Sequence, residues 1–199
     1  MSNLMTIQTP NFIEEYSSSV SAIDCVRLIQ LFETKKDLHV VGMTTQGFKP
    51  ENKDDTEICI TQGLLESDEE WSDAIQPVLS ALSKNLDEYK KKYVTIDDID
   101  SWSLEPNGFN FQKFLPNQGY KQWHCEGGSG DSSKRTLVWM LYLNTVQDKG
   151  GTDFHYQNYT CKAEVGKMVI WPPFWTHFHK SQVSPSELKY IMTGWMSYV

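Results

Sequence analysis

The run Arg135-Thr136-Leu137-Val138-Trp139-Met140-Leu141-Tyr142-Leu143-Asn144 decides how the second half of the chain is interpreted. It has the length and the apolar pattern of a buried strand. Other short apolar runs, separated by clusters of Gly, Asn and Asp, continue from about residue 107 onward. Several short strands at such spacing are typical of an antiparallel sandwich or barrel.

Two helices are expected before this β-rich half. Ser21 and Asp24 form a capping box, and the apolar spacing that follows predicts a helix over 19–34. A second helix is expected to begin near Ser67–Asp68, and Pro77 inside it predicts a kink or a broken first turn. The apolar stripe of this second helix consists of Trp71, Ile75, Val78, Leu82, Leu86, Tyr89 and Tyr93.

Shorter segments lie around these helices. Residues 38–42 and 56–60 have the pattern of strands, and 11–16 has that of a short strand or a docking segment. The polar residues 43–57 contain Gly, Pro and an Asn-Lys-Asp-Asp cluster, so this stretch is expected to be a surface loop.

The composition is that of a folded domain. The chain has 199 residues, 39% of them hydrophobic, which is enough to build a sizeable core. We therefore expect one domain over 1–199, in which 1–105 braces a β-rich core formed by 106–199.

Charge and targeting patterns limit the partners and the cellular compartment that we expect for the protein. The net charge of -8 disfavours binding along a nucleic-acid backbone. Residues 1–20 lack the pattern of a signal peptide, and no apolar run reaches the ~20 residues of a membrane span. The four cysteines form no CxxC pair. These features predict a cytoplasmic protein with free thiols and no membrane partner.

Two clusters offer metal ligands. His124 and Glu126 stand two positions apart, which in a strand places both side chains on one face. By the same alternation Cys125 points away, and we do not expect it to bind metal. A later segment offers a further imidazole, from either His177 or His179. Two imidazoles and one carboxylate are typical of Fe(II) sites that keep three coordination positions open.

Lys189 is the other unusual residue of this half. A lysine inside a β-core is costly unless it is paired. If it lies opposite the metal, it would hold the far carboxylate of a dicarboxylic co-substrate.

An ordered set of motifs links these residues. His124-Cys125-Glu126 is followed by Tyr142-Leu143-Asn144, by the Gly150–Phe154 turn, by Trp171-Pro172, and by a histidine and a lysine ten residues apart. This order resembles the Fe(II)/2-oxoglutarate oxygenases of the prolyl 4-hydroxylase-like group, in particular its small bacterial and phage members. The resemblance covers about residues 107–198.

The resemblance implies a fold and a ligand set. The fold would be α+β, mainly β, with a double-stranded β-helix (jelly-roll) core braced by N-terminal helices. The iron ligands would be His124, Glu126 and His179, because only His179 stands ten residues before Lys189. Lys189 and the Tyr142 hydroxyl would bind the C5 carboxylate of 2-oxoglutarate.

Other positions are less typical of the group. Most members have Asp where this chain has Glu126, and several have Tyr where it has Phe114. His177 is expected to lie on the same strand face as His179, beside the site. Arg135 is a candidate for the mouth of the active site.

The implied activity is hydroxylation of an unactivated C–H bond, with a prolyl residue of a protein or peptide as the leading substrate and a small molecule as another. Ascorbate is a candidate reductant. The loops 43–57 and 127–134 are candidates for a substrate lid.

Two other functions fit parts of the pattern. A cupin-like metal enzyme would use the three ligands without 2-oxoglutarate, so that Lys189 would be dispensable. A non-catalytic jelly-roll module would bind sugar or peptide without His124 and Glu126.

Overall fold

The run quoted above forms the strand β8 (Arg135–Tyr142), which lies inside the largest sheet of the computed structural model. The structure describes residues 10–44 and 47–199. The order of this sheet is β1-β11-β8-β13-β6-β4-β2, with β5 also paired to β13, and all of its pairs are antiparallel. The other strands are β1 (Glu14–Tyr16), β2 (Val40–Val41), β4 (Thr56–Ile60), β5 (Trp102–Leu104), β6 (Phe109–Phe114), β11 (Met168–Trp171) and β13 (Lys189–Tyr198).

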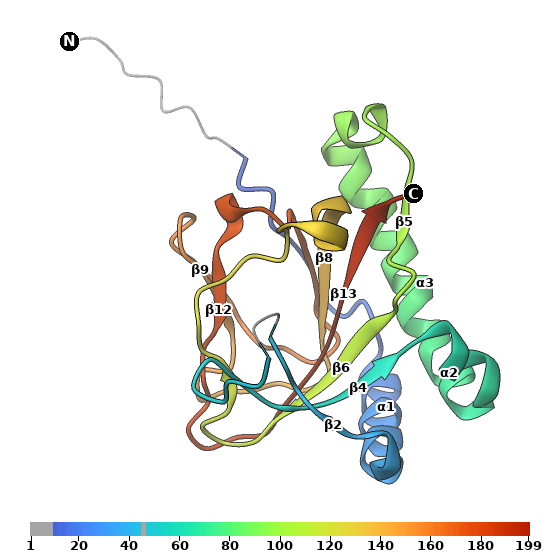
Figure 1. Cartoon of the computed structure of the whole chain (residues 1–199), viewed down its shortest axis with the longest axis vertical. Coiled ribbons are helices and arrows are strands. Elements are labelled where there is room, and N and C mark those ends of the chain that lie inside the picture. The colour runs from blue at the N-terminus through green and yellow to red at the C-terminus, as the bar shows by residue number, and fades with distance from the viewer. Residues whose placement is uncertain (1–9, 45–46) are drawn as a thin grey trace.

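A smaller antiparallel sheet faces the large one. It has the order β10-β9-β12, and β3 pairs with β7 nearby. Figure 1 shows β9 and β12 on one side of β8 and β13, and the helices on the other side. The antiparallel sandwich predicted for the second half of the chain is therefore confirmed. These strands are β3 (Lys53–Asp54), β7 (Gly119–Tyr120), β9 (Thr152–Phe154), β10 (Tyr159–Cys161) and β12 (His179–Ser181).

The strand β8 is apolar on both faces because it is covered on both. Its residues Leu137, Trp139 and Leu141 belong to the core between the large sheet and the helices. The alternating residues Val138 and Met140 belong to the second core, between the two sheets. Burial of both faces produces the near-continuous apolar run in the sequence.

Two long helices cover the large sheet, as predicted. In α1 (Ala22–Thr34) the side chain of Ser21 accepts a hydrogen bond from the Asp24 backbone N–H at 3.1 Å. In α3 (Glu69–Lys92) Asp68 caps the Trp71 N–H at 3.2 Å. The α-helix α2 (Gln62–Ser67) and the 3-10 helices Lys36–Leu38 (η1), Val94–Asp98 (η2), Gly130–Lys134 (η3) and Trp175–His177 (η4) complete the helical elements.

Pro77 does not break α3. The helix runs through it from residue 69 to 92, so the expected break of the first turn is wrong, and the alternative of a kink stays a prediction. Trp71, Ile75 and Val78 are fully buried on either side of the proline. Burial of these large side chains offsets the backbone hydrogen bond that proline removes.

The short segments largely follow the predictions. The strands β1, β2 and β4 lie within 11–16, 38–42 and 56–60. The stretch 43–57 is not a loop throughout, because it contains β3 and the start of β4, and its residues 45–46 lie outside the described part. None of the helices that the structure describes is long and apolar enough to cross a membrane.

Candidate metal centre

The two histidines predicted as ligands meet across a single β-bridge. The His124 N–H donates to the His179 carbonyl at 3.0 Å, and the His179 N–H donates to the His124 carbonyl at 2.9 Å. The centroids of the two imidazole rings are 4.3 Å apart. The bridge thus joins the segment before β8 to the start of β12 and brings distant parts of the sequence into one site.

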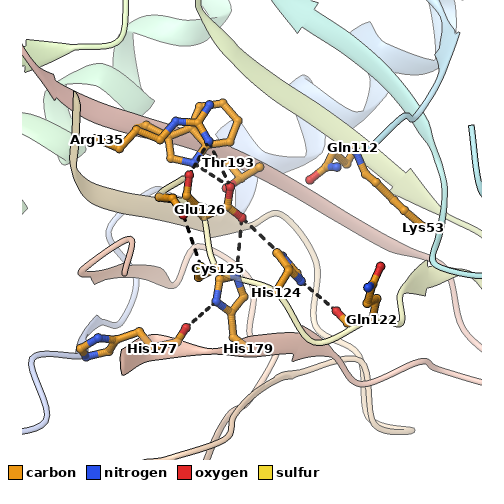
Figure 2. A network of polar contacts seen from close by, with 12 residues as sticks. Lys53, Gln112, Gln122, His124, Cys125, Glu126, Arg135, His177, His179 and Thr193 are labelled. Atoms are coloured by element: carbon orange, nitrogen blue, oxygen red, sulfur yellow. Dashed lines mark hydrogen bonds and ion pairs between the residues drawn. The ribbon is translucent and has the colours of Figure 1, made fainter. Parts of the chain in front are cut away.

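Glu126 completes a group of three potential ligands. Its Oε1 lies 3.4 Å from His124 Nε2 and 3.6 Å from His179 Nε2. One ligand atom from each residue lies within 4.8 Å of the other two (Figure 2). The structure therefore brings together the three side chains that the sequence predicts as ligands.

Backbone carbonyls fix the tautomer of each imidazole. His124 Nδ1 lies 2.9 Å from the Gln122 carbonyl, and His179 Nδ1 lies 2.8 Å from the His177 carbonyl. A carbonyl oxygen only accepts, so each Nδ1 carries the hydrogen and each Nε2 keeps its lone pair. Both lone pairs are then directed toward Glu126 Oε1, an arrangement common to histidines that bind metal ions.

The second oxygen of Glu126 is held from behind. Oε2 accepts a hydrogen bond from Trp195 Nε1 at 3.0 Å and lies 3.4 Å from the Arg135 guanidinium. Arg135 stacks 3.6 Å from the Trp195 ring centroid and pairs with Glu105 at 2.9 Å. These contacts leave Oε1 facing the histidines, so the longer side chain of glutamate is placed as firmly as an aspartate would be.

The charges of the three groups suit a divalent cation. Burial favours the neutral acid, yet the neighbouring imidazoles of His124 and His179 lower the pKa of Glu126 well below its ordinary value. Burial, and then the neighbouring His124, lower the pKa of His179. A carboxylate beside neutral imidazoles is the protonation state that binds metal. Two nitrogens and one oxygen on one side of an open cavity fit Fe(II).

The cavity beside these ligands has a volume of about 220 Å³ and is also lined by Lys189. Lys189 is 4% exposed, and burial lowers its pKa to about 8. Its Nζ hydrogen-bonds Ser181 Oγ and lies 4.7 Å from the Phe114 ring centroid. Among the described residues no carboxylate lies within ion-pair distance of it, so the wall offers a cation for an acidic ligand.

Tyr142, the other residue expected to bind the co-substrate, lies behind this wall. Its hydroxyl is fully buried and 2.7 Å from Thr152 Oγ1. Of these two residues Thr152 lines the cavity. A direct contact between Tyr142 and a ligand remains a prediction. It requires the Tyr142 hydroxyl either to break its hydrogen bond with Thr152 or to bind Thr152 and the ligand at the same time.

His177 lies differently from the expectation. It belongs to η4 and not to the strand of His179, because the chain turns before β12 begins. Its Nε2 is 2.9 Å from the Asn11 carbonyl, and Figure 2 shows the ring turned away from His124, Glu126 and His179. Only its backbone carbonyl supports the site, through His179.

Sequence reasoning missed Ser181, which hydrogen-bonds Lys189, and three further residues of the site. Trp195 shares a strand face with Lys189, because both are odd-numbered positions of β13, and this alternation was a usable signal. Glu105 lies in a connection before β6 and gave no signal. The third is Gln112 on β6, which lines the cavity between the metal ligands and a buried ion cluster.

The ion cluster consists of Lys53, Asp55 and Glu57. Lys53 hydrogen-bonds Glu57 Oε1 and lies 3.7 Å from Asp55 Oδ2. Gln112 Nε2 donates to Asp55 Oδ2 at 2.7 Å and to Glu57 Oε1 at 2.6 Å. Burial, and then the negative charge of Glu57, raise the pKa of Asp55 to about 8.

Comparison with solved structures found similar folds among prolyl hydroxylases. The viral collagen prolyl hydroxylase of Paramecium Bursaria Chlorella virus-1, in a 2OG complex, has a TM-score of 0.68 at 19% identity, covering 94% of this chain and 97% of that one. A Pseudomonas putida prolyl-4-hydroxylase has a TM-score of 0.64 at 17% identity, covering 94% and 93%. A Trichoplax adhaerens prolyl hydroxylase, bound to a fragment of a hypoxia inducible factor, has a TM-score of 0.72 at 14% identity, covering 94% and 84%.

Comparison with protein-family models and with curated proteins found no match. At such low identities the structural likeness establishes the fold. The predicted α+β fold, mainly β, with a jelly-roll core braced by N-terminal helices, is confirmed.

Proposed function

We propose that this chain is an Fe(II)- and 2-oxoglutarate-dependent oxygenase. The observation that carries the proposal is that His124, Glu126 and His179 meet in a cavity that also contains the buried cation Lys189. When bound, Fe(II) and 2-oxoglutarate would allow dioxygen to hydroxylate an unactivated C–H bond: one oxygen atom would enter the substrate and the other would enter succinate, with release of CO2. The likeness to prolyl hydroxylases, one of them in a 2OG complex, supports the same assignment.

Each residue has a separate task in this proposal. The two Nε2 atoms and Glu126 Oε1 hold the metal from one side and leave the opposite side open to co-substrate. Lys189 and Ser181 hold the C5 carboxylate of 2-oxoglutarate, and the Tyr142 hydroxyl is proposed to reach the same carboxylate. Arg135 and Trp195 keep Glu126 from rotating.

A prolyl residue of a protein or peptide is the proposed substrate. The similar structures are prolyl hydroxylases, and one of them holds a peptide fragment. Met43 and Thr44 line part of the cavity, and they belong to the loop proposed as a lid. Ascorbate is proposed only as a reductant that restores Fe(II) after unproductive turnover.

The test is anaerobic addition of Fe(II) and 2-oxoglutarate to the purified protein. We expect a visible metal-to-ligand charge-transfer band, together with slow Fe(II)-dependent formation of succinate in air. The band should disappear in His179→Ala and weaken in Lys189→Ala, because these changes remove a ligand and the partner of the C5 carboxylate.

His177→Ala is the matched control, because His177 supports the site only through its backbone. It should keep the band. A band that survives in His179→Ala but is lost in His177→Ala would refute the ligand set. Absence of both the band and succinate in the wild type would refute the oxygenase.

A further inference from the structure

One face of β6 forms part of the cavity wall. Asn110, Gln112 and Phe114 alternate along the strand and line the cavity, while Phe109 and Phe111 point into the helix-side core. Their partners on β13, in the same order, are Thr193, Ile191 and Lys189. Gln112 therefore lies on the same strand face as Phe114, the partner of Lys189, and two residues before it in β6.

The carboxamide of Gln112 has one allowed orientation. Its Nε2 lies 2.7 Å from Asp55 Oδ2 and 2.6 Å from Glu57 Oε1. Rotating the amide by half a turn would place its oxygen against Glu57 Oε1, a carboxylate oxygen that is paired with Lys53 and has no hydrogen to donate. Lys53 holds Glu57 in place through a buried ion pair.

The oxygen of Gln112 therefore faces the cavity. Gln112 is 5% exposed, and its Oε1 has no hydrogen-bond partner anywhere in the described part of the chain. Figure 2 shows this oxygen on the side of the residue that faces Glu126. A buried acceptor on a cavity wall needs a donor when a ligand replaces water.

The co-substrate does not provide this donor. At neutral pH 2-oxoglutarate has two carboxylates and a ketone, and all of these groups accept hydrogen bonds. A donor must therefore come from the molecule that is oxidised.

We propose that Gln112 Oε1 accepts a hydrogen bond from an N–H group of the substrate and thereby selects substrates that carry such a donor next to the oxidised residue. The inference rests on the proposed function. Proline has no backbone N–H. For a prolyl peptide, the donor is the backbone N–H of the residue that follows proline.

Asn110 provides a matched comparison on the same strand face. No hydrogen bond holds its carboxamide to any residue that the structure describes, so the group is free to rotate and present either N–H or oxygen. It lacks the fixed polarity of Gln112, and we expect it to impose no requirement for a donor.

Two synthetic peptides test the proposal: acetyl-Ala-Pro-Gly-amide and its N-methylglycine analogue, which lacks only the N–H after proline. Each is titrated anaerobically into the Fe(II)-2-oxoglutarate complex, and its affinity is read from the change in the charge-transfer band. The wild type should bind the first peptide about 5-fold more tightly, the effect of one hydrogen bond.

Variants assign this preference to Gln112. Gln112→Met should bind the two peptides equally, whereas Asn110→Ala should keep the preference. A wild type that forms the band but binds both peptides equally, or neither, overturns the role of Gln112 and leaves the oxygenase intact. A wild type without the band overturns the proposed function itself, and the two failures are therefore distinguishable.

Discussion

At the scale of single residues, the two oxygens of Glu126 have different environments. Oε1 faces two imidazole nitrogens, and Oε2 faces the Trp195 indole and the Arg135 guanidinium. A carboxylate held at one oxygen loses little freedom when the other binds a metal ion. In the proposed metal site, the supporting residues would therefore contribute to metal affinity without touching the metal.

Replacing Trp195 with Phe tests this support. The change removes the hydrogen bond to Oε2 and keeps an aromatic ring for the Arg135 stack. We expect metal affinity to fall about 10-fold, measured by competition with a coloured Fe(II) chelator. Trp175→Phe is the control, because Trp175 is 68% exposed. Equal affinities of the two variants would contradict a positioning role for the indole.

At the scale of elements, the sequence predicted strands and helices wherever their periodicity reflects burial. The apolar run of β8 and the stripe of α3 are examples, since both are set by the cores that they contact. The prediction that His177 and His179 share a strand was wrong. Alternation over three residues occurs in a strand and also across the end of a 3-10 helix, so the pattern could not separate the two cases. The short helix α2 has no buried residue, so its sequence has no apolar periodicity from which a helix could be predicted.

The candidate site, like the fold, was predictable only in part. The three candidate ligands could be predicted from their residue types and their order in the sequence, and the structure brings them together. Their supports are the carbonyls of Gln122 and His177, and carbonyls have no sequence signature. Gln112 and Glu105 depend on which distant side chains face them, which only the fold determines.

Pro77 allows a prediction about α3. Proline removes one backbone hydrogen bond from a helix that otherwise runs unbroken. Pro77→Ala should therefore raise the free energy of unfolding, by about 1–3 kcal/mol, measured by urea denaturation. The exposed helix position Ser80→Ala is the control, with an expected change below about 0.5 kcal/mol. A decrease on Pro77→Ala would mean that the proline ring contributes packing that outweighs the hydrogen bond.

At the scale of the whole molecule, the buried ion cluster links stability to pH. Asp55 has a pKa of about 8 in the folded protein, against an ordinary value of 3.8. Between these values the folded state holds a proton that the unfolded state has released. The contribution of Asp55 to stability is therefore fully present below the lower value and is lost as pH rises toward the upper one.

Asp55→Asn should flatten this dependence. In the wild type we expect the free energy of unfolding to fall as pH rises through the window from 3.8 to about 8, and the variant should show a smaller slope. Urea denaturation at several pH values measures both slopes. Asp73→Asn, an exposed position of α3, should keep the wild-type slope. Identical slopes in all three proteins would exclude Asp55 as the source.

The position of β13 in the large sheet has a consequence for synthesis on the ribosome. This strand pairs with β8 on one side and with β6 on the other, yet both of these precede it in the chain. The nascent chain therefore has a gap in its sheet until residues 189–198 emerge. Lys189 and Trp195 arrive with the same strand, so under the proposed function the site for metal and co-substrate is complete only when the sheet closes.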